Sequence, residues 1–550
     1  MKKKLFNLSR PIFVWMLIFF TAYPTLIFPQ ASNPILELAS RAAGYVPYQE
    51  PDFLTFDELK RLYENPSPEG RLKEKLERLW KTPIINNQAY IQGAKPHAPK
   101  DPRLGPYLRL ASWNIEKSIH MERVIKLFTS EADFRQMVDS GSVPVESEKY
   151  KEIERQRQKL LNADIIVLQE MDIGVKRSDY LNAAAELAKA LKMNYAYGPE
   201  QLEIDPVMLG IDKILLEDGQ VDQEAMDYYV VDPARYKGVF GSAVLSRYPI
   251  KHVEVFQLEH QAYDWYNGEK KQTTFLEKSR RFGSKTVFKN EITREMKVGG
   301  RIYFRVDLEV PELPEGTLTI INIHLEIKCE PKGREYQISE ILSYMRGIKH
   351  PVIMVGDFNS GSHDMSPTSV SREAGRAVKN PTNWLQAAVT YLSPYGLVIN
   401  TTRGASNITK NFQDPTSRDI PVIAPNPVKG LFEIIENFRS DNGMAFDFRG
   451  DHERSINGDD GTLANSNQRD LKGFKTTFQV KRPVGALIGK YRLDWVFVKS
   501  YLQHPKDKNG SYRFAPHYGE TLEEMNMSLT EPLSDHHPNV VDLPFEEPKI

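Results

Sequence analysis

From residue 108 onward, short apolar runs alternate with longer segments of helical periodicity. Runs of roughly four to eight apolar residues are typical of buried strands, and apolar residues every three or four positions are typical of amphipathic helices. The presence of many strands and fewer helices favours a layered α/β sandwich. The pattern predicts strands at 108–115, 164–169, 242–245, 301–310, 318–324, 351–355 and 492–498, and helices at 149–162, 181–191 and 334–346.

The segment before this region, residues 32–106, is rich in proline and charge. Between Phe56 and Trp80, apolar residues recur at helical spacing, which predicts one or two amphipathic helices. Four prolines lie within 95–106 and indicate a linker or an extended strap. We therefore expect an N-terminal helical extension, 32–106, before a main domain of residues 107–550.

Two stretches of the main domain interrupt the alternation. Residues 200–237 carry clusters of Asp and Glu, and residues 432–476 are rich in Asn, Asp, Gly and Arg. Both are interpreted as insertions, and the second is expected to be a loop or a small subdomain because it has few apolar residues with which to build a core.

The first 31 residues have the composition of a targeting segment. Three lysines and an arginine precede the apolar stretch Pro11–Phe28, which is the order found in signal peptides. Pro29 stands where a small residue is preferred before cleavage after Ala31, so an uncleaved membrane anchor is the alternative. The apolar stretch is near the lower length limit for a span, and Pro24 weakens the anchor interpretation. We expect export, periplasmic or secreted, with membrane association through the N-terminus as the second possibility.

Charge and cysteine content narrow the function classes. The 550 residues include 72 Lys plus Arg and 73 Asp plus Glu, for a net charge of -1. The chain therefore has no overall excess of positive charge of the kind that would indicate binding to nucleic acid or to an anionic membrane. A local basic groove is still compatible with these totals. Cys329 is the only cysteine, which excludes an intrachain disulfide and a cysteine-rich zinc site.

The tetrapeptide Gly356–Asn359 follows the apolar run 351–355. An apolar run closed by glycine is typical of a buried strand that ends in a sharp turn, and active sites collect at the carboxyl ends of strands. An aspartate there can orient or deprotonate a water, and an asparagine can hold a phosphate oxygen. Asp357 and Asn359 are therefore candidate catalytic residues, with an Asx turn that caps the strand as the alternative.

Other polar residues also stand at predicted strand ends. Asn114 and Glu116 end one strand, Glu170 a second and His324 a third. The carboxylate of Glu170 follows four apolar residues so closely that we expect it to be desolvated, and therefore paired or metal-bound. The alternatives are a capping asparagine, a salt bridge from Glu170 to the basic pair at 176–177, and a structural histidine.

Asp494 lies inside a strand of Leu, Trp, Val and Phe. A buried carboxylate needs a partner, and histidine is a natural one because the carboxylate fixes the imidazole tautomer and raises its pKa. The candidates lie in the segment 534–538, which contains Asp535, His536 and His537.

In this order and in these contexts, the residues resemble the endonuclease/exonuclease/phosphatase superfamily, whose members include pancreatic-type deoxyribonuclease, abasic-site endonucleases, neutral sphingomyelinases and inositol polyphosphate 5-phosphatases. The resemblance covers roughly residues 108–543. The long gap between Asn359 and Asp494 departs from compact members and bears on the substrate rim. The matching segments are WNIE at 113–116, DIIVLQE at 164–170, GSAVLSRYPI at 241–250, INIHLE at 321–326, VGDFNS at 355–360, LDWVFV at 493–498 and SDHHP at 534–538.

The resemblance implies a four-layer α/β/β/α sandwich of the DNase I type, with two packed mixed sheets and the site at one end. It implies a phosphoric ester hydrolase that depends on Mg²⁺ or Mn²⁺. Glu170 would be the main metal ligand, and Asn114, Glu116 and Asp535 would support that ion or a second one.

The resemblance also implies the catalytic roles. Asp357 would activate the water for in-line attack together with the metal, and Asn359 would position the phosphate and that water. His536, held by Asp494, would contact the phosphoryl group or assist the leaving oxygen. His324 would be a second phosphate-binding histidine.

The substrate is less constrained than the chemistry. We expect a phosphodiester, most simply of a nucleic acid, because the basic segment Lys270–Lys297 can supply phosphate contacts; a solvated loop is the alternative. A sphingomyelinase or phospholipase C-like lipid phosphodiesterase lacks a convincing apolar contact loop here, and an inositol or sugar phosphatase lacks a signature. A non-catalytic binding protein on the same scaffold is disfavoured because all the expected groups are present. No obligate protein partner is indicated.

Overall fold

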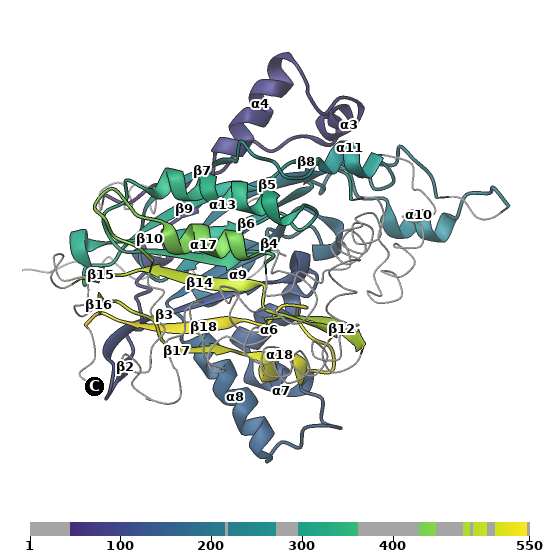
Figure 1. The fold of residues 1–550 in the computed structure, drawn as a ribbon. Coiled ribbons are helices and arrows are strands. Elements are labelled where there is room, and N and C mark those ends of the chain that lie inside the picture. The colour runs from purple at the N-terminus through teal and green to yellow at the C-terminus, as the bar shows by residue number, and fades with distance from the viewer. Residues whose placement is uncertain are drawn as a thin grey trace, which may run out of the picture.

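The structure is a computed structural model that describes residues 44–214, 218–270, 295–360, 428–446, 477–484, 488–502 and 512–546. Within these residues the chain forms two β-sheets that pack face to face, with helices on both outer sides (Figure 1). None of the helices in the described ranges is long and apolar enough to span a membrane. The proposed targeting segment, 1–31, lies outside the described residues.

The larger sheet has the strand order β1-β5-β6-β4-β3-β18-β17, with β2 paired to β3 and β8 paired to β5. Only β3 and β4 are parallel along this path. The strands are β1 (Ile84–Asn86), β2 (Lys100–Asp101), β3 (Gly105–Asn114), β4 (Ile165–Ile173), β5 (Asn194–Glu203), β6 (Val239–Ser246), β8 (Lys297–Gly299), β17 (His517–Thr521) and β18 (Asn539–Pro544).

The smaller sheet has the order β14-β11-β10-β9-β7, and here β10 and β11 form the parallel pair. Each sheet therefore has one parallel pair, whose two carboxyl ends lie at the same edge. The strands are β7 (Ile250–Gln257), β9 (Ile302–Glu309), β10 (Thr317–His324), β11 (Val352–Asp357) and β14 (Asp494–Lys499).

Three apolar layers separate the sheets and helices. On β4, Val167 faces the layer between the sheets, whereas Leu168 faces the helices outside the larger sheet. On β11, Val355 faces the same inter-sheet layer, and Met354 packs toward helices on the other side. Both faces of these strands are buried, which explains why they are continuous apolar runs rather than alternating ones. The predicted four-layer α/β/β/α sandwich is confirmed.

The helices cover the two outer faces. The layer outside the larger sheet includes residues of α6 (Met121–Thr129), α7 (Glu131–Met137), α8 (Glu148–Leu161), α9 (Ala183–Leu191) and α18 (Glu523–Met527). The layer outside the smaller sheet includes residues of α13 (Pro331–Met345) and α17 (Lys429–Asn437). Shorter elements are α5 (Gln88–Ile91), α10 (Gln223–Tyr229), α11 (Trp265–Lys270), η1 (Glu116–Ser118), η2 (Lys176–Ser178), η3 (Pro314–Gly316), β12 (Phe478–Val484), β13 (Ile488–Tyr491), β15 (Tyr501–Leu502) and β16 (Tyr512–Arg513).

The N-terminal extension contains the two helices expected there, α3 (Phe56–Glu64) and α4 (Gly70–Lys81). Thr55 caps α3 in a reciprocal capping box with Glu58. Leu59 and Leu79 are fully buried in the apolar layer of the larger sheet, and β1 pairs with β5. The extension is thus packed onto the sandwich, and β1 forms one edge of the larger sheet.

The two expected insertions are only partly described. Residues 200–203 belong to β5, and α10 lies further along the first stretch. In the second stretch, residues 432–437 are helical, and Phe432 is fully buried against the smaller sheet. The prediction that an insertion begins at 432 is therefore wrong for residues 432–437, which belong to a helix packed on the smaller sheet. Residues 447–476 lie outside the described ranges, so the expected loop or subdomain there stays a prediction.

Candidate active site

The strand register aligns three of the predicted site residues at one edge of the smaller sheet. His324 is the last residue of β10, and it is the register partner of Asp357 at the end of β11. Asp357 is in turn the register partner of Asp494, the first residue of β14. Residues that are distant in sequence thus become neighbours because parallel and antiparallel pairings meet at the same edge.

The carboxylate of Asp357 is buried and lies between the two sheets. Its Oδ1 accepts a hydrogen bond from the backbone N–H of Asn359 at 2.8 Å, and its Oδ2 accepts one from Nδ2 of Asn114 at 3.1 Å. Burial and the neighbouring Asp494 raise the pKa of Asp357. The Asx turn considered as an alternative is therefore present, but it uses only one oxygen and leaves the other facing the larger sheet.

Asn359 lies in the turn that follows, with a φ of 47°. Asparagine tolerates this left-handed conformation better than most residues. Its Nδ2 donates to the carbonyl oxygen of Leu325 at 2.9 Å, which ties the turn after β11 to the loop after β10.

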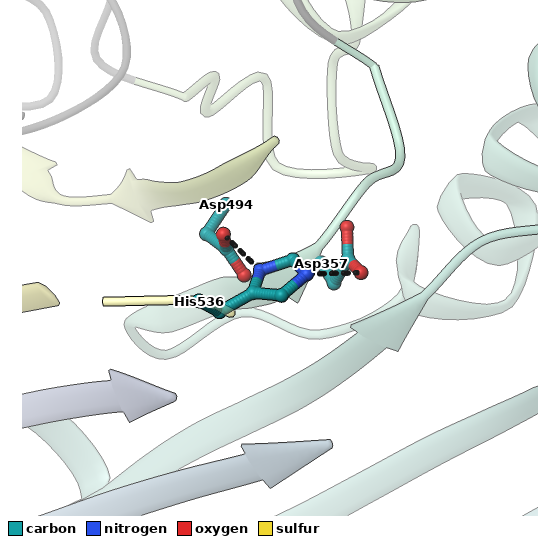
Figure 2. Close-up of side chains that lie close together, drawn as sticks. All are labelled: Asp357, Asp494 and His536. Atoms are coloured by element: carbon teal, nitrogen blue, oxygen red, sulfur yellow. Dashed lines mark hydrogen bonds and ion pairs between the residues drawn. The ribbon is translucent and has the colours of Figure 1, made fainter. Parts of the chain in front are cut away.

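The buried Asp494 has the histidine partner that we expected. Its Oδ2 lies 2.8 Å from Nδ1 of His536, and Nε2 of the same imidazole lies 3.9 Å from Oδ2 of Asp357. Figure 2 shows the imidazole between the two carboxylates. Burial lowers the pKa of His536, but Asp494 and Asp357 outweigh this and raise it well above its ordinary value. The two carboxylates therefore favour the protonated imidazole, and its Nε2 faces Asp357.

A serine that was not singled out from the sequence holds this histidine in place. Ser534 Oγ donates to the carbonyl oxygen of Asn114 at 2.7 Å and accepts from the backbone N–H of His536 at 3.0 Å. The Nε1 of Trp113 donates to the carbonyl oxygen of His536 at 3.0 Å. The segment before β18 is thereby fixed to the end of β3. His537, to which no role was assigned, is buried with its Nδ1 3.1 Å from Nδ2 of Asn526.

Glu170 projects from a β-bulge. The pairing of β4 with β6 shifts register between Leu168 and Met171, and Glu170 has a φ of 60°. A bulge places an extra residue on one strand and redirects its side chain, so the strand continues to Ile173 and does not end at Glu170 as predicted. The carboxylate is 22% exposed and lies 3.8 Å from Nε2 of His324.

The salt bridge considered for Glu170 is not formed. Arg177 pairs with Asp172 and Glu203, and Lys176 donates to two backbone carbonyl oxygens. Burial raises the pKa of Glu170, but His324 and nearby positive charge outweigh this and lower it. Glu170 thus lies at the site edge without the partner expected at 176–177, and its lowered pKa favours the ionised carboxylate.

Asn114, Glu116 and Asp535 meet beside Glu170. The backbone N–H of Glu116 donates to Oδ1 of Asn114 at 3.1 Å, and that of Asp535 donates to a carboxylate oxygen of Glu116 at 3.2 Å. Asn114 also donates a hydrogen bond to Glu170 that contributes to its lowered pKa. All nine residues predicted for the site are therefore gathered at one end of the sandwich.

The comparisons with known proteins bear on this arrangement. A sequence model of the Endonuclease/Exonuclease/phosphatase family matches residues 111–536. The chain belongs to this family. No curated protein gives a match to the sequence.

Similar solved structures were also found. One is an endonuclease/exonuclease/phosphatase from Beutenbergia cavernae DSM 12333, with 16% identity, coverage of 80% of this chain and 71% of that chain, and a TM-score of 0.32. The catalytic domain of human Nocturnin has 13% identity, coverage of 80% and 95%, and a TM-score of 0.32. A 3'-5' exonuclease from Neisseria meningitidis has 12% identity, coverage of 79% and 99%, and a TM-score of 0.33.

Members of the endonuclease/exonuclease/phosphatase family are generally dependent on a divalent metal, and the residues present here suit one. Carboxylate and amide oxygens are the ligands that Mg²⁺ and Mn²⁺ prefer, and Glu170 offers a partly exposed, ionised carboxylate. Asn114, Glu116 and Asp535 add oxygen atoms beside it. In the described residues, Asp357, Asp494 and His536 also bring ligand atoms within 4.8 Å of one another. We favour the first set for the ion, because the Nδ1–Asp494 hydrogen bond already occupies His536.

The structure adds a residue that sequence reasoning missed, Glu200. It is fully buried on β5 at a second bulge, between Pro199 and Gln201, and its Oε2 lies 3.2 Å from Nδ1 of His324. Burial raises the pKa of Glu200, but His324 and Arg301 outweigh this and lower it to about 2. Each site histidine of this family member thus has a buried carboxylate behind it. Gly198 and Pro199 separate Glu200 from the apolar and aromatic start of β5, and the insertion predicted from the sequence begins at Glu200.

Gly356 of the family motif is required by a close approach of two strands. Its φ is 140°, and a Cβ there would lie 2.1 Å from the carbonyl oxygen of Ile323. We expect Gly356→Ala to destabilise the fold by about 3 kcal/mol, measured by chemical unfolding. In Gly347→Ala the new Cβ would meet its nearest neighbour at 3.8 Å, so this control should change stability by less than about 1 kcal/mol. Equal effects of the two substitutions would contradict the packing argument.

Proposed function

We propose that the protein is an exported, divalent-metal-dependent phosphodiesterase that acts on nucleic acid. The observation that carries the proposal is the alignment of Asp357, His536 and Asp494 across the sheet edge, with Asn359 in the adjoining turn. Family membership supports hydrolysis of a phosphate ester, and the position of Glu170 supports a metal beside these groups.

The chain's own residues suggest how such a reaction proceeds. Asp357 has a raised pKa, which suits a carboxylate that takes a proton from the attacking water. The Asn359 amide is fixed by Leu325 and would orient the phosphate, while the cationic His536 would donate a hydrogen bond to the phosphoryl oxygens or the leaving oxygen. A divalent cation held by Glu170 with Asn114, Glu116 and Asp535 would supply charge neutralisation.

Asp494→Asn should narrow the pH range of activity from the alkaline side. Asp494 is the largest of the causes that raise the pKa of His536, so its loss lowers that pKa. A reaction that needs the imidazolium is then lost at lower pH than in the wild type, by about one pH unit or more. The measurement is the pH dependence of kcat for bis-p-nitrophenyl phosphate, with the exposed Asp57→Asn as control. An unchanged alkaline limb would exclude the assigned role of the pair.

Nucleic acid is preferred over other phosphodiesters because lysines lie beside the site. Lys117 directly follows Glu116, and Lys297, from the basic segment, is only 3% exposed, so at this residue the segment is not a solvated loop. Residues 271–294 lie outside the described ranges. The experiment is parallel assay of plasmid DNA, RNA, sphingomyelin and inositol phosphates with Mg²⁺ or Mn²⁺. Fastest turnover of sphingomyelin or an inositol phosphate would replace nucleic acid in the proposal.

Export is proposed from the first 31 residues. We expect the mature protein from native cells to begin near residue 32, as determined by mass spectrometry of its N-terminal peptide. An intact N-terminus in a membrane fraction would favour the anchor, and an intact N-terminus in the cytoplasmic fraction would contradict export.

A further inference from the structure

Three lysines from separate elements surround one carboxylate beside the site. Glu295 forms an ion pair with Lys117 of η1, and its other oxygen lies 3.0 Å from Nζ of Lys297 on β8. Lys328, in the loop after β10, is the third lysine whose charge lowers the pKa of Glu295, although burial raises it. The positive charge is thus gathered at one place by the fold and is not spread along the chain.

This cluster of Lys117, Lys297 and Lys328, which we call the lysine cluster, borders the catalytic residues. Lys117 is close enough to Glu170 for its charge to lower the pKa of that ligand. The Nζ of Lys297 lies 4.9 Å from the centre of the Phe240 ring, and that ring is 6.0 Å from the ring of His324. The cluster therefore lies on the side of the site formed by Glu170 and His324.

The lysine cluster differs from two arginines that also lie near the site. Arg177 and Arg301 each pair with two carboxylates whose side chains are at most 5% exposed, so their charge is neutralised by fixed groups. Lys117 and Lys297 share Glu295, whose side chain is 24% exposed, whereas Lys297 is 3% exposed. Glu295 is thus a partly exposed carboxylate that covers the nearly buried Lys297.

Lys117 and Lys297 depend on Glu295 for their ion pair, whereas Lys328 does not. Lys328 has its own partner, Glu269, at 2.6 Å, and it also lies 4.4 Å from the Trp265 ring centre. Displacement of Glu295 would leave Lys117 and Lys297 without the ion-pair partner shown here, and Lys297 is almost fully buried. An anion that replaced the Glu295 carboxylate would restore the pairing, and a phosphate has more acceptor oxygens than a carboxylate.

We propose that the lysine cluster is a subsite for a second phosphate group of the substrate, and that the Glu295 side chain occupies this subsite in the free protein. The proposal rests on the proposed function, because it places one phosphate at Asp357 and His536 and another at the lysines. It specifies the substrate class as an ester that carries at least two phosphates, such as a nucleic acid strand or a phosphorylated nucleotide.

Binding measurements test the subsite without turnover. With Ca²⁺ present, calorimetry should show that the wild type binds thymidine 3′,5′-bisphosphate about tenfold more tightly than either thymidine monophosphate, which is the effect of one charged hydrogen-bonding site. Lys297→Met should remove this preference. If Lys297→Met does not fold, Lys117→Met takes its place, since that side chain is 28% exposed.

Glu295→Gln separates a subsite from a structural ion pair. Removal of a competing carboxylate should strengthen binding of the bisphosphate severalfold, whereas loss of a purely structural pair would weaken it or leave it unchanged. Lys151→Met is the matched control, because Lys151 pairs with Glu148 at 2.7 Å on the exposed face of α8; it should behave as the wild type.

The binding results decide whether the subsite exists, independently of whether the protein is a phosphodiesterase. No preference for the bisphosphate in the wild type, or a preference that Lys297→Met leaves intact, overturns the subsite. So does a Glu295→Gln variant that binds the bisphosphate less tightly than the wild type does, or equally tightly. Hydrolysis of bis-p-nitrophenyl phosphate in the same preparations reports on the catalytic site alone, since that substrate has only one phosphate.

Discussion

Asp357→Asn is expected to lower turnover of bis-p-nitrophenyl phosphate by at least about 100-fold, the lower range for removal of a general base. The substitution keeps the size of the side chain and an acceptor for the Asn359 N–H, but it removes the group that would take the proton. It also removes a buried negative charge next to Asp494, so the protein should remain folded. Steady-state kinetics with thermal unfolding measures both effects.

Asp307→Asn is a suitable control for this prediction. Asp307 is also a largely buried carboxylate of the smaller sheet. Its register partner on β10 is Thr319, near the start of that strand, whereas the register partner of Asp357 is His324, at the end of β10. Its partner is Arg305 at 2.7 Å. We expect normal turnover in this variant. Near-normal turnover in Asp357→Asn would remove Asp357 from the proposed mechanism.

Glu170→Gln is expected to have the second large effect, through the metal. We predict that the metal concentration for half-maximal activity rises at least about tenfold, because even groups that only support metal ligands typically contribute 10- to 100-fold in affinity, and that turnover falls by about 100-fold or more at low metal. Gln keeps the shape of the side chain but replaces an ionised carboxylate with a neutral amide. Titration of activity with Mg²⁺ and Mn²⁺ measures the change.

Glu122→Gln, on α6, serves as the control for Glu170→Gln. The carboxylate of Glu122 is 80% exposed and pairs with Lys126 on the same helix, and Glu122 is not one of the proposed site residues. It should titrate with metal as the wild type does. If Glu170→Gln required no more metal than the wild type, the ion would have to be held elsewhere, and the group of Asp357, Asp494 and His536 would become the first candidate.

Sequence reasoning predicted the strands and the site residues at their ends for a physical reason. Strands buried on both faces, such as β4 and β11, contain unbroken apolar runs, and the glycine that closes the run of β11 stands one residue before the end of that strand. The need of buried Asp494 for a partner also pointed to the segment of His536, 42 residues later. These features depend on burial and chemistry, which the residue types report directly.

The features that were missed depend on register. Glu170 was predicted as a site residue, but its bulge was not, and Glu200 at the second bulge was not predicted at all. A bulge changes which face a residue occupies without changing the residue pattern. The second carboxylate–histidine pair, Glu200 with His324, was therefore not anticipated. Helix α17 was not predicted because most of its apolar residues lie at the beginning of the stretch 432–476, which is polar on average. The residues around Ser534 in the sequence do not indicate its role, because its hydrogen bond to Asn114 of β3 forms only when the fold brings the two segments together.

The central claim is that this end of the sandwich hydrolyses phosphodiesters with a divalent metal, and bis-p-nitrophenyl phosphate tests it most directly because its hydrolysis requires no nucleic-acid or lipid contacts. The wild-type protein, freed of metal with EDTA, is assayed before and after addition of Mg²⁺ or Mn²⁺. We predict no release of p-nitrophenol above background without metal and recovery of turnover with it. Failure to hydrolyse the substrate with either metal, or hydrolysis that persists in excess EDTA, would contradict the claim.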